Sequence, residues 1–303
     1  MPSASSVPAG TVVAAPAGRA VVGMADLTPG VPSALSPLVR RIVAPNPGPF
    51  TGPGTNTYLV GIDEVAVIDP GPDVASHVDG IVGASMKERV RWVVLTHTHP
   101  DHFPAAKRLV KATGAEVLAY GRRLDKEFDL RIDRTIDEGD TIEGTEFGLD
   151  VLHTPGHAPN HLCFRLEEER LLFTGDTVLG GTWSVVNPRR GGDMTAYLAT
   201  LARIEKLRLT RIAPGHGEVI DAPRARVQEY VAHRIEREQQ IVAQLKKAPA
   251  RVAELVDAIY GGEELPDELL EAAGWQVHAH LLRLKALGEV AGTSVKSVWK
   301  LAS

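Results

Sequence analysis

The run Thr-His-Thr-His-Pro-Asp-His at residues 96–102 constrains this chain more than any other feature. It follows the apolar stretch 91–95, which has the composition of a buried strand. His97 and His99 are two positions apart and can point the same way, while Asp101 and His102 fall where a helix is expected to begin and can face a second ion. One loop at the end of a strand can therefore supply ligands to two metal sites.

Three later turns carry further ligand-type residues, and each follows another β-like run. His157 ends the Thr-Pro-Gly-His turn 154–157, Asp176 comes directly after Gly175, and His216 lies in the Pro-Gly-His-Gly turn 214–217. A carboxylate just past a glycine at a strand end can bridge two cations. Four ligand-bearing turns at four strand ends predict one converging site, whereas a solvated polar loop at 96–102 would leave the other three turns unexplained.

Short β-branched runs alternate with amphipathic stretches from about residue 38 to residue 220. This alternation predicts an α/β fold in which helices cover β-sheets. We expect strands at 57–60, 65–68, 92–95, 116–119, 147–152, 162–166, 170–173 and 211–213, and helices at 75–84, 104–112 and 194–207. The candidate ligands fall at the ends of these strands.

The chain divides into four parts. Residues 1–35, rich in Ala, Pro, Gly and Ser, predict a disordered tail, and residues 36–222 form the expected catalytic domain. Residues 223–248 predict a connecting helix with no breaker before Pro249. Residues 249–303 predict helices at 251–260, 265–273 and 275–287, followed by a hairpin of 289–291 with 295–301. This last part has the pattern of three helices and a wing.

Composition narrows the classes of protein that fit. The net charge of −5 gives no basic excess of the kind that announces a nucleic-acid binder. Prolines and glycines interrupt the first residues, so we expect no secretory signal, no membrane partner and a cytoplasmic location. The lone Cys163 lies in a strand-like run and is interpreted as a small core residue, which suits a reducing compartment.

The four turns together resemble those of the metallo-β-lactamase superfamily: T-H-x-H-x-D-H, T-P-G-H, G-D and P-G-H-G. The resemblance spans roughly residues 40–220 and implies a four-layer αββα sandwich. It implies one ion on His97, His99 and His157, a second ion on Asp101, His102 and His216, and Asp176 bridging both.

Two further residues take expected roles from the same resemblance. Asp69, in Val-Ile-Asp-Pro-Gly, matches the superfamily's first acidic motif and would orient a ligand without being one. His161, four residues after His157, resembles a second histidine of many relatives and is our candidate for a substrate contact.

Hydrolysis is the reaction that such a site favours. Two divalent ions about 4 Å apart lower the pKa of a water between them and polarise the bond under attack. Resemblance and position assign Asp101 to hold that water and accept its proton. The nitrogen-rich ligand set favours Zn²⁺, although Mn²⁺ or iron would also fit.

The C-terminal part suggests a substrate. Residues 275–288 look like the recognition helix of a winged helix, and nearly the whole chain is similar to a lactamase-β-like family that includes single-strand-specific endoribonucleases. Single-stranded RNA is therefore the leading substrate hypothesis, with Arg283, Lys285, Lys296 and Lys300 as a basic strip for phosphates.

Two alternatives stay open. One is a hydrolase of small esters, thioesters or lactones that resembles hydroxyacylglutathione hydrolase, which shares the metal turns but carries a different tail. The other is a DNA-binding regulator that uses the metal domain only as a scaffold. β-Lactam hydrolysis is disfavoured, because lactam-hydrolysing relatives generally lack the bridging aspartate. The sequence leaves the oligomeric state open, a homodimer included.

Overall fold

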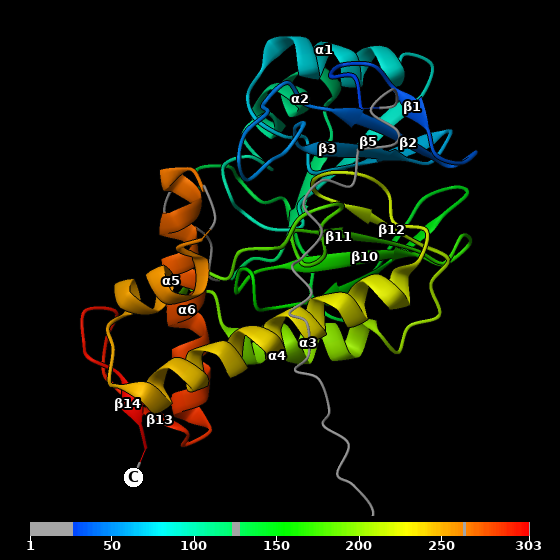
Figure 1. Ribbon diagram of the computed structural model, residues 1–303. Helices are drawn as coiled ribbons and strands as arrows, with labels where there is room; N and C mark the ends of the chain where they lie inside the picture. The colour runs from blue at the N-terminus through cyan, green and yellow to red at the C-terminus, as the bar shows by residue number, and fades with distance from the viewer. Residues whose placement is uncertain (1–26, 123–127, 263–264, 303) are drawn as a thin grey trace, which may run out of the picture.

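The computed structural model describes residues 27–122, 128–262 and 265–302. Within them, two β-sheets pack face to face (Figure 1). The first sheet has the order β1-β2-β3-β4-β5-β6-β7 and the second the order β12-β11-β10-β9-β8. The strands of the first sheet are β1 (Ser33–Ala34), β2 (Val39–Val43), β3 (Asn56–Val60), β4 (Glu64–Ile68), β5 (Arg89–Val94), β6 (Glu116–Ala119) and β7 (Arg134–Thr135). Those of the second are β8 (Thr141–Glu143), β9 (Gly148–His153), β10 (Leu162–Leu166), β11 (Leu171–Gly175) and β12 (Arg211–Pro214).

Apolar side chains fill the space between the sheets, and helices cover the two outer faces. Tyr58 and Phe173, one from each sheet, meet in the central core with ring centroids 5.1 Å apart. Helices α1 (Ala75–Ala84) and α2 (Ala106–Thr113) cover the first sheet, while α3 (Met194–Ile204) and the long α4 (Pro223–Lys247) cover the second (Figure 1). The expected four-layer αββα sandwich is confirmed.

Strand direction explains where the ligand turns lie. Strands β4, β5 and β6 are parallel to one another, so their carboxyl ends meet at one edge of the first sheet. In the second sheet β11 is parallel to β12, and β9 points the same way because β10 is antiparallel to both β9 and β11. The turns after β5, β9, β11 and β12 carry all seven predicted ligands, and the hydrogen bond from Leu162 N to Thr96 O, 2.7 Å long, joins the two sheets at this edge.

A separate core holds the C-terminal module together. Helices α5 (Val252–Tyr260) and α6 (Asp267–Ala286) pack with the end of α4 around Leu255, Leu281 and Trp299. Strands β13 (Val290–Ala291) and β14 (Lys300–Leu301) form the predicted hairpin after α6. Ala279 of α6 belongs instead to the core beneath the second sheet, so the module is docked on the metal domain.

Three expectations need correction. Residues 27–35 are part of the folded domain, because Leu27 is buried and β1 pairs with β2; residues 1–26 of the predicted tail lie outside the described residues. The predicted helices 265–273 and 275–287 are one helix, which runs through Gly274 without a break while Ala273 and Val277 on either side pack into the core of the C-terminal module. Strands β1, β2, β7 and β8 were not expected. No helix in the described part of the chain is long and apolar enough to span a bilayer.

Candidate metal centre

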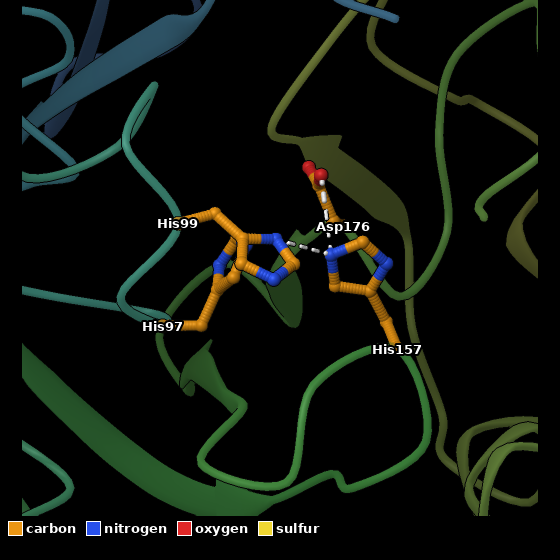
Figure 2. Close-up of side chains that lie close together, drawn as sticks. All are labelled: His97, His99, His157 and Asp176. Carbon is orange, nitrogen blue, oxygen red and sulfur yellow. Dashed lines mark hydrogen bonds and ion pairs between the residues drawn. The ribbon is translucent and has the colours of Figure 1, made fainter. Parts of the chain in front are cut away.

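The first group of ligands comes from three of the four turns. His97 and His99 follow β5, His157 follows β9, and Asp176 follows β11; all four are buried and point toward one another (Figure 2). Nε2 of His157 lies 2.9 Å from Nδ1 of His99 and 3.6 Å from Oδ2 of Asp176. Nε2 of His97 is buried without a hydrogen-bond partner. Three imidazoles and a carboxylate thus present one ligand atom each to a common point.

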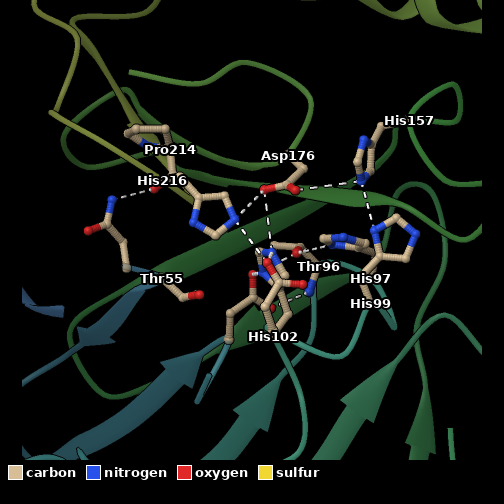
Figure 3. A network of polar contacts seen from close by, with 12 residues as sticks. Thr55, Thr96, His97, His99, His102, His157, Asp176, Pro214 and His216 are labelled. Carbon is tan, nitrogen blue, oxygen red and sulfur yellow. Dashed lines mark hydrogen bonds and ion pairs between the residues drawn. The ribbon is translucent and has the colours of Figure 1, made fainter. Parts of the chain in front are cut away.

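The second group lies next to the first. Nε2 of His216 is 3.1 Å from Oδ2 of Asp101 and 3.4 Å from Oδ1 of Asp176, and Nε2 of His102 is 3.5 Å and 3.4 Å from the same two oxygens. Asp176 therefore turns one oxygen to each group, as Figure 3 shows. This is the arrangement of a carboxylate that bridges two ions.

The spacing of these atoms fits metal ligands. Ligands about 2.0–2.1 Å from a tetrahedral zinc ion lie roughly 3.4 Å from one another. The distances between the ligand atoms above range from 2.9 to 3.6 Å, and within each group all ligand atoms lie within 4.8 Å of one another. The residues present therefore fit two divalent cations, and the structure brings together all seven predicted ligands.

Asp69 supports the second group from below. It is buried after β4, its Oδ2 accepts from Nδ1 of His102 at 2.8 Å, and its Oδ1 accepts from the Thr96 backbone N–H at 2.8 Å. By holding the Nδ1 proton, the carboxylate leaves Nε2 of His102 to face the site. Its backbone has φ 49°, a left-handed conformation that a non-glycine residue adopts at a cost. The role expected for Asp69, orienting a ligand, agrees with this geometry.

Asn56 has a role that the sequence did not suggest. Its Nδ2 donates to the carbonyls of Pro214 and Gly217, both at 2.9 Å, and its backbone N–H donates to Gly215 O at 2.8 Å. It thus fixes the turn that carries His216. Gly215 itself is required there, because a Cβ atom would lie 2.7 Å from Oδ1 of Asp176. The partners of these side-chain hydrogen bonds are 158 or more positions away in the sequence, so no local pattern could have predicted this role.

The protonation of these groups follows from their neighbours. Burial lowers the pKa of His97, His99 and His157, which favours neutral imidazoles able to donate a lone pair. Burial opposes ionisation of Asp101, but the nearby His102 and His216 outweigh it and lower the pKa of that carboxyl. For His102 burial is outweighed by Asp101, Asp176 and Asp69, which raise its pKa. Binding of a cation by the second group therefore competes with protonation of His102.

His161 does not lie where a substrate contact was expected. It is fully buried, its Nε2 accepts from the Asp176 backbone N–H at 3.1 Å, and its Nδ1 lies 2.9 Å from Oγ1 of Thr154. Its ring also stacks on His97, with centroids 4.9 Å apart. His161 therefore supports Asp176 and His97 from beneath, one residue before β10 begins, and it is not among the residues that line the pocket over the ligands.

The four residues of the predicted basic strip differ in exposure. Arg283 is paired with Glu238 through Nη1 and Oε2, and only Lys285, Lys296 and Lys300 are exposed. Lys285 lies ten residues after Trp275, about 15 Å further along the helix at 1.5 Å per residue. The hairpin with the other two lysines follows the end of α6, away from the sandwich (Figure 1).

A pocket of about 580 Å³ opens above the ligands and ends on His99, Asp101, His157 and Asp176. The loop after β2 and the segment after β11 provide two walls, and α6 provides a third through Trp275. Its apolar lining residues include Phe50, Leu179, Trp183, Val185, Leu269 and Trp275, and its basic ones are Arg189 and Arg190. The sequence did not suggest that the C-terminal module would form part of this pocket.

Comparison with known proteins places this geometry in a family. Residues 50–216 match the metallo-beta-lactamase superfamily, and residues 252–299 match the beta-lactamase associated winged helix domain. The chain is 36% identical to a Caenorhabditis elegans beta-lactamase-like protein 2 homolog over 70% of this chain and 72% of that protein. It is 32% identical to an Aspergillus chevalieri protein named atrochrysone carboxyl ACP thioesterase over 79% and 78% of the two chains.

A solved structure agrees in fold. A beta-lactamase domain protein from Burkholderia ambifaria superposes with a TM-score of 0.78 at 22% identity, covering 92% of this chain and 96% of the other. The hypothesis of a DNA-binding regulator that uses the metal domain only as a scaffold does not agree with these matches and an intact ligand set. The chain belongs to the metallo-β-lactamase superfamily and is a metal-dependent hydrolase with a C-terminal winged helix domain.

Proposed function

We propose that this hydrolase cleaves thioesters whose acyl group is apolar. The observation that carries the proposal is the pocket: a chamber of about 580 Å³ with mainly apolar walls that ends directly on the metal ligands. Apolar walls favour an acyl or aryl group, since burying such surface is worth about 25 cal/mol per Å². A relative that bears the name of a thioesterase supports the same reading.

The chemistry that we propose uses zinc as the bound metal, because five of the seven ligands are imidazoles. When bound, two such ions would lower the pKa of a water and polarise the substrate carbonyl. Asp101, at the floor of the pocket, accepts the proton of the attacking water. The new C–O bond replaces the C–S bond, and the leaving thiolate takes up the proton. The products are a carboxylic acid and a thiol.

The basic residues of the pocket suit the other end of the substrate. Arg189 and Arg190 line the same pocket as the apolar side chains, so an anionic group on the thiol part would be attracted to them. A thioester with an apolar acyl chain and an anionic carrier arm matches both parts of the lining.

Single-stranded RNA is the second candidate, since Trp183 and Trp275 border the pocket together with Arg189 and Arg190. Aromatic rings and arginines are the usual means of binding single strands. However, the Trp183 ring is already stacked on His233, with centroids 4.1 Å apart and an interplanar angle of 2°. Less of that ring is left for a base, which is why we place RNA second.

The test compares substrates on the zinc-loaded protein. Acetyl, hexanoyl and benzoyl thioesters of N-acetylcysteamine, a lactone and a single-stranded RNA are assayed side by side. We expect kcat/KM for hexanoyl to exceed that for acetyl by about tenfold or more, because the apolar walls contact the longer chain. Trp275→Ala should reduce this preference more than it reduces acetyl hydrolysis. RNA cleavage with no thioester hydrolysis would replace the proposal by the second candidate.

A further inference from the structure

One of the contacts between the C-terminal module and the metal domain is a buried amide. Gln276 of α6 is 8% exposed, its Oε1 accepts from the Val186 backbone N–H at 3.0 Å, and its Nε2 donates to the Ser184 carbonyl at 3.0 Å. Both ends of the side chain are therefore bonded to the backbone of residues 184–186. A side chain bonded in this way fixes the position of the residue between its two partners.

A second helix reinforces the same contact. Arg234 of α4 is 1% exposed, and its Nη2 donates to the Ser184 carbonyl at 2.5 Å. Its guanidinium also lies over the Tyr197 ring, 5.3 Å from the centroid. The Ser184 carbonyl thus receives donors from α4 and α6, the two long helices outside the ligand-bearing turns.

Residues 184–186, which Gln276 and Arg234 hold, in turn bond the metal ligand His157. The Val185 carbonyl, between the two bonded residues, accepts from Nδ1 of His157 at 2.7 Å. With the proton on Nδ1, Nε2 of His157 carries the lone pair, and it lies 2.9 Å from Nδ1 of His99. The ring orientation of His157 therefore depends on where Val185 lies.

We propose that Gln276 is a positioning residue for the metal centre, acting on His157 through the backbone of residues 184–186. The winged helix domain then has a second role besides lining the pocket: it completes the support of one of the two metal groups. The other group has supports of its own, since Asp69 holds His102 and the Gly54 carbonyl lies 3.3 Å from Nδ1 of His216. Loss of Gln276 should therefore affect the two groups unequally.

Gln276→Met tests this, because methionine fills a similar volume but can make neither hydrogen bond. Zinc affinity of the full chain is measured by competition with a chromophoric chelator, which needs no substrate. We expect one of the two zinc equivalents to bind about tenfold more weakly and the other to be unchanged, in line with the effect of removing support from a metal ligand.

Leu281→Ala is the matched control. Leu281 lies on the same helix and is fully buried in the core of the C-terminal module. Its loss should lower the melting temperature while both zinc equivalents keep their affinity. Equal loss of zinc in both variants would mean that general loosening of the module is responsible, and it would overturn the proposal.

Wild-type zinc affinity in folded Gln276→Met would also overturn it. If that variant does not fold, Gln276→Glu takes its place: it keeps the acceptor for Val186 but cannot donate to Ser184, and unchanged zinc binding there contradicts the proposal. Thioester hydrolysis is not measured in any of these tests, so the proposed substrate and the positioning role can fail independently.

Discussion

The edge of the two sheets and the contact between α4 and α6 each bury a histidine beside a carboxylate, but they use the pair differently. His102 bonds Asp69 at 2.8 Å, His280 bonds Glu238 at 3.1 Å, and both rings are fully buried with Nε2 unpartnered. Around Nε2 of His102 gather Asp101 and Asp176, whereas no such group of ligand atoms surrounds His280 among the described residues. Glu238 instead takes Arg283 as a second partner. Convergence of several free ligand atoms, more than the pair itself, distinguishes a metal site from a structural contact.

The largest expected effect is on the metal side of this comparison. Asp101→Ala should lower kcat by about 10²–10⁴-fold, because it removes a ligand and the proposed proton acceptor. The Asp101 side chain is 30% exposed at the pocket floor, so the fold should survive. Steady-state kinetics and circular dichroism check the two parts separately. Near-normal turnover at full zinc occupancy would reject the role of Asp101.

Glu238→Ala should have the opposite outcome. It leaves Arg283 and the buried His280 without their shared carboxylate, and loss of one member of a largely buried ion pair costs about 3 kcal/mol of unfolding free energy. Urea unfolding measures that loss. Elemental analysis should still find two zinc ions per chain at saturating zinc. Loss of zinc from Glu238→Ala would contradict the purely structural role assigned to the His280–Glu238 pair.

A smaller effect is expected at His161, which contacts the metal ligands Asp176 and His97 without being a ligand itself. His161→Asn removes the acceptor for the Asp176 backbone N–H and should weaken zinc binding by about tenfold. Because His161 is fully buried, KM at saturating zinc should stay close to the wild-type value. An increase in KM under those conditions would restore the substrate contact that the sequence suggested.

The smallest effect is expected at the exposed lysines of the C-terminal module. Replacing Lys285, Lys296 and Lys300 by Ala should change both thioester hydrolysis and any RNA cleavage by less than about twofold, because phosphate contacts act locally and these residues lie beyond the pocket. If three phosphate contacts were lost instead, the slope of log affinity for RNA against log salt would fall by about 2. Such a fall would favour the nuclease reading.

Sequence reasoning located the fold and the ligand set because their signals are local. A β-branched run followed by a short turn with histidine or aspartate can be read within a few residues, as at 91–102 and 154–157. The break expected at Gly274 was wrong because a local signal of this kind does not include tertiary packing. A glycine costs about 1 kcal/mol inside a helix, and the packing of Ala273, Val277 and Leu281 around it more than offsets that cost.

The sequence by itself determined which side chains could bind metal, since residue type and spacing define a ligand turn. Only the tertiary structure decided which side chains support and surround them. Asn56 reaches the turn of His216 across 158 positions, and Gln276 reaches Val186 across 90. The tertiary structure also buried His161 and placed Trp275 on the pocket wall. These contacts join segments that are distant in the chain, and they form because packing the helices on the sheets brings together polar groups that must find partners once they are buried.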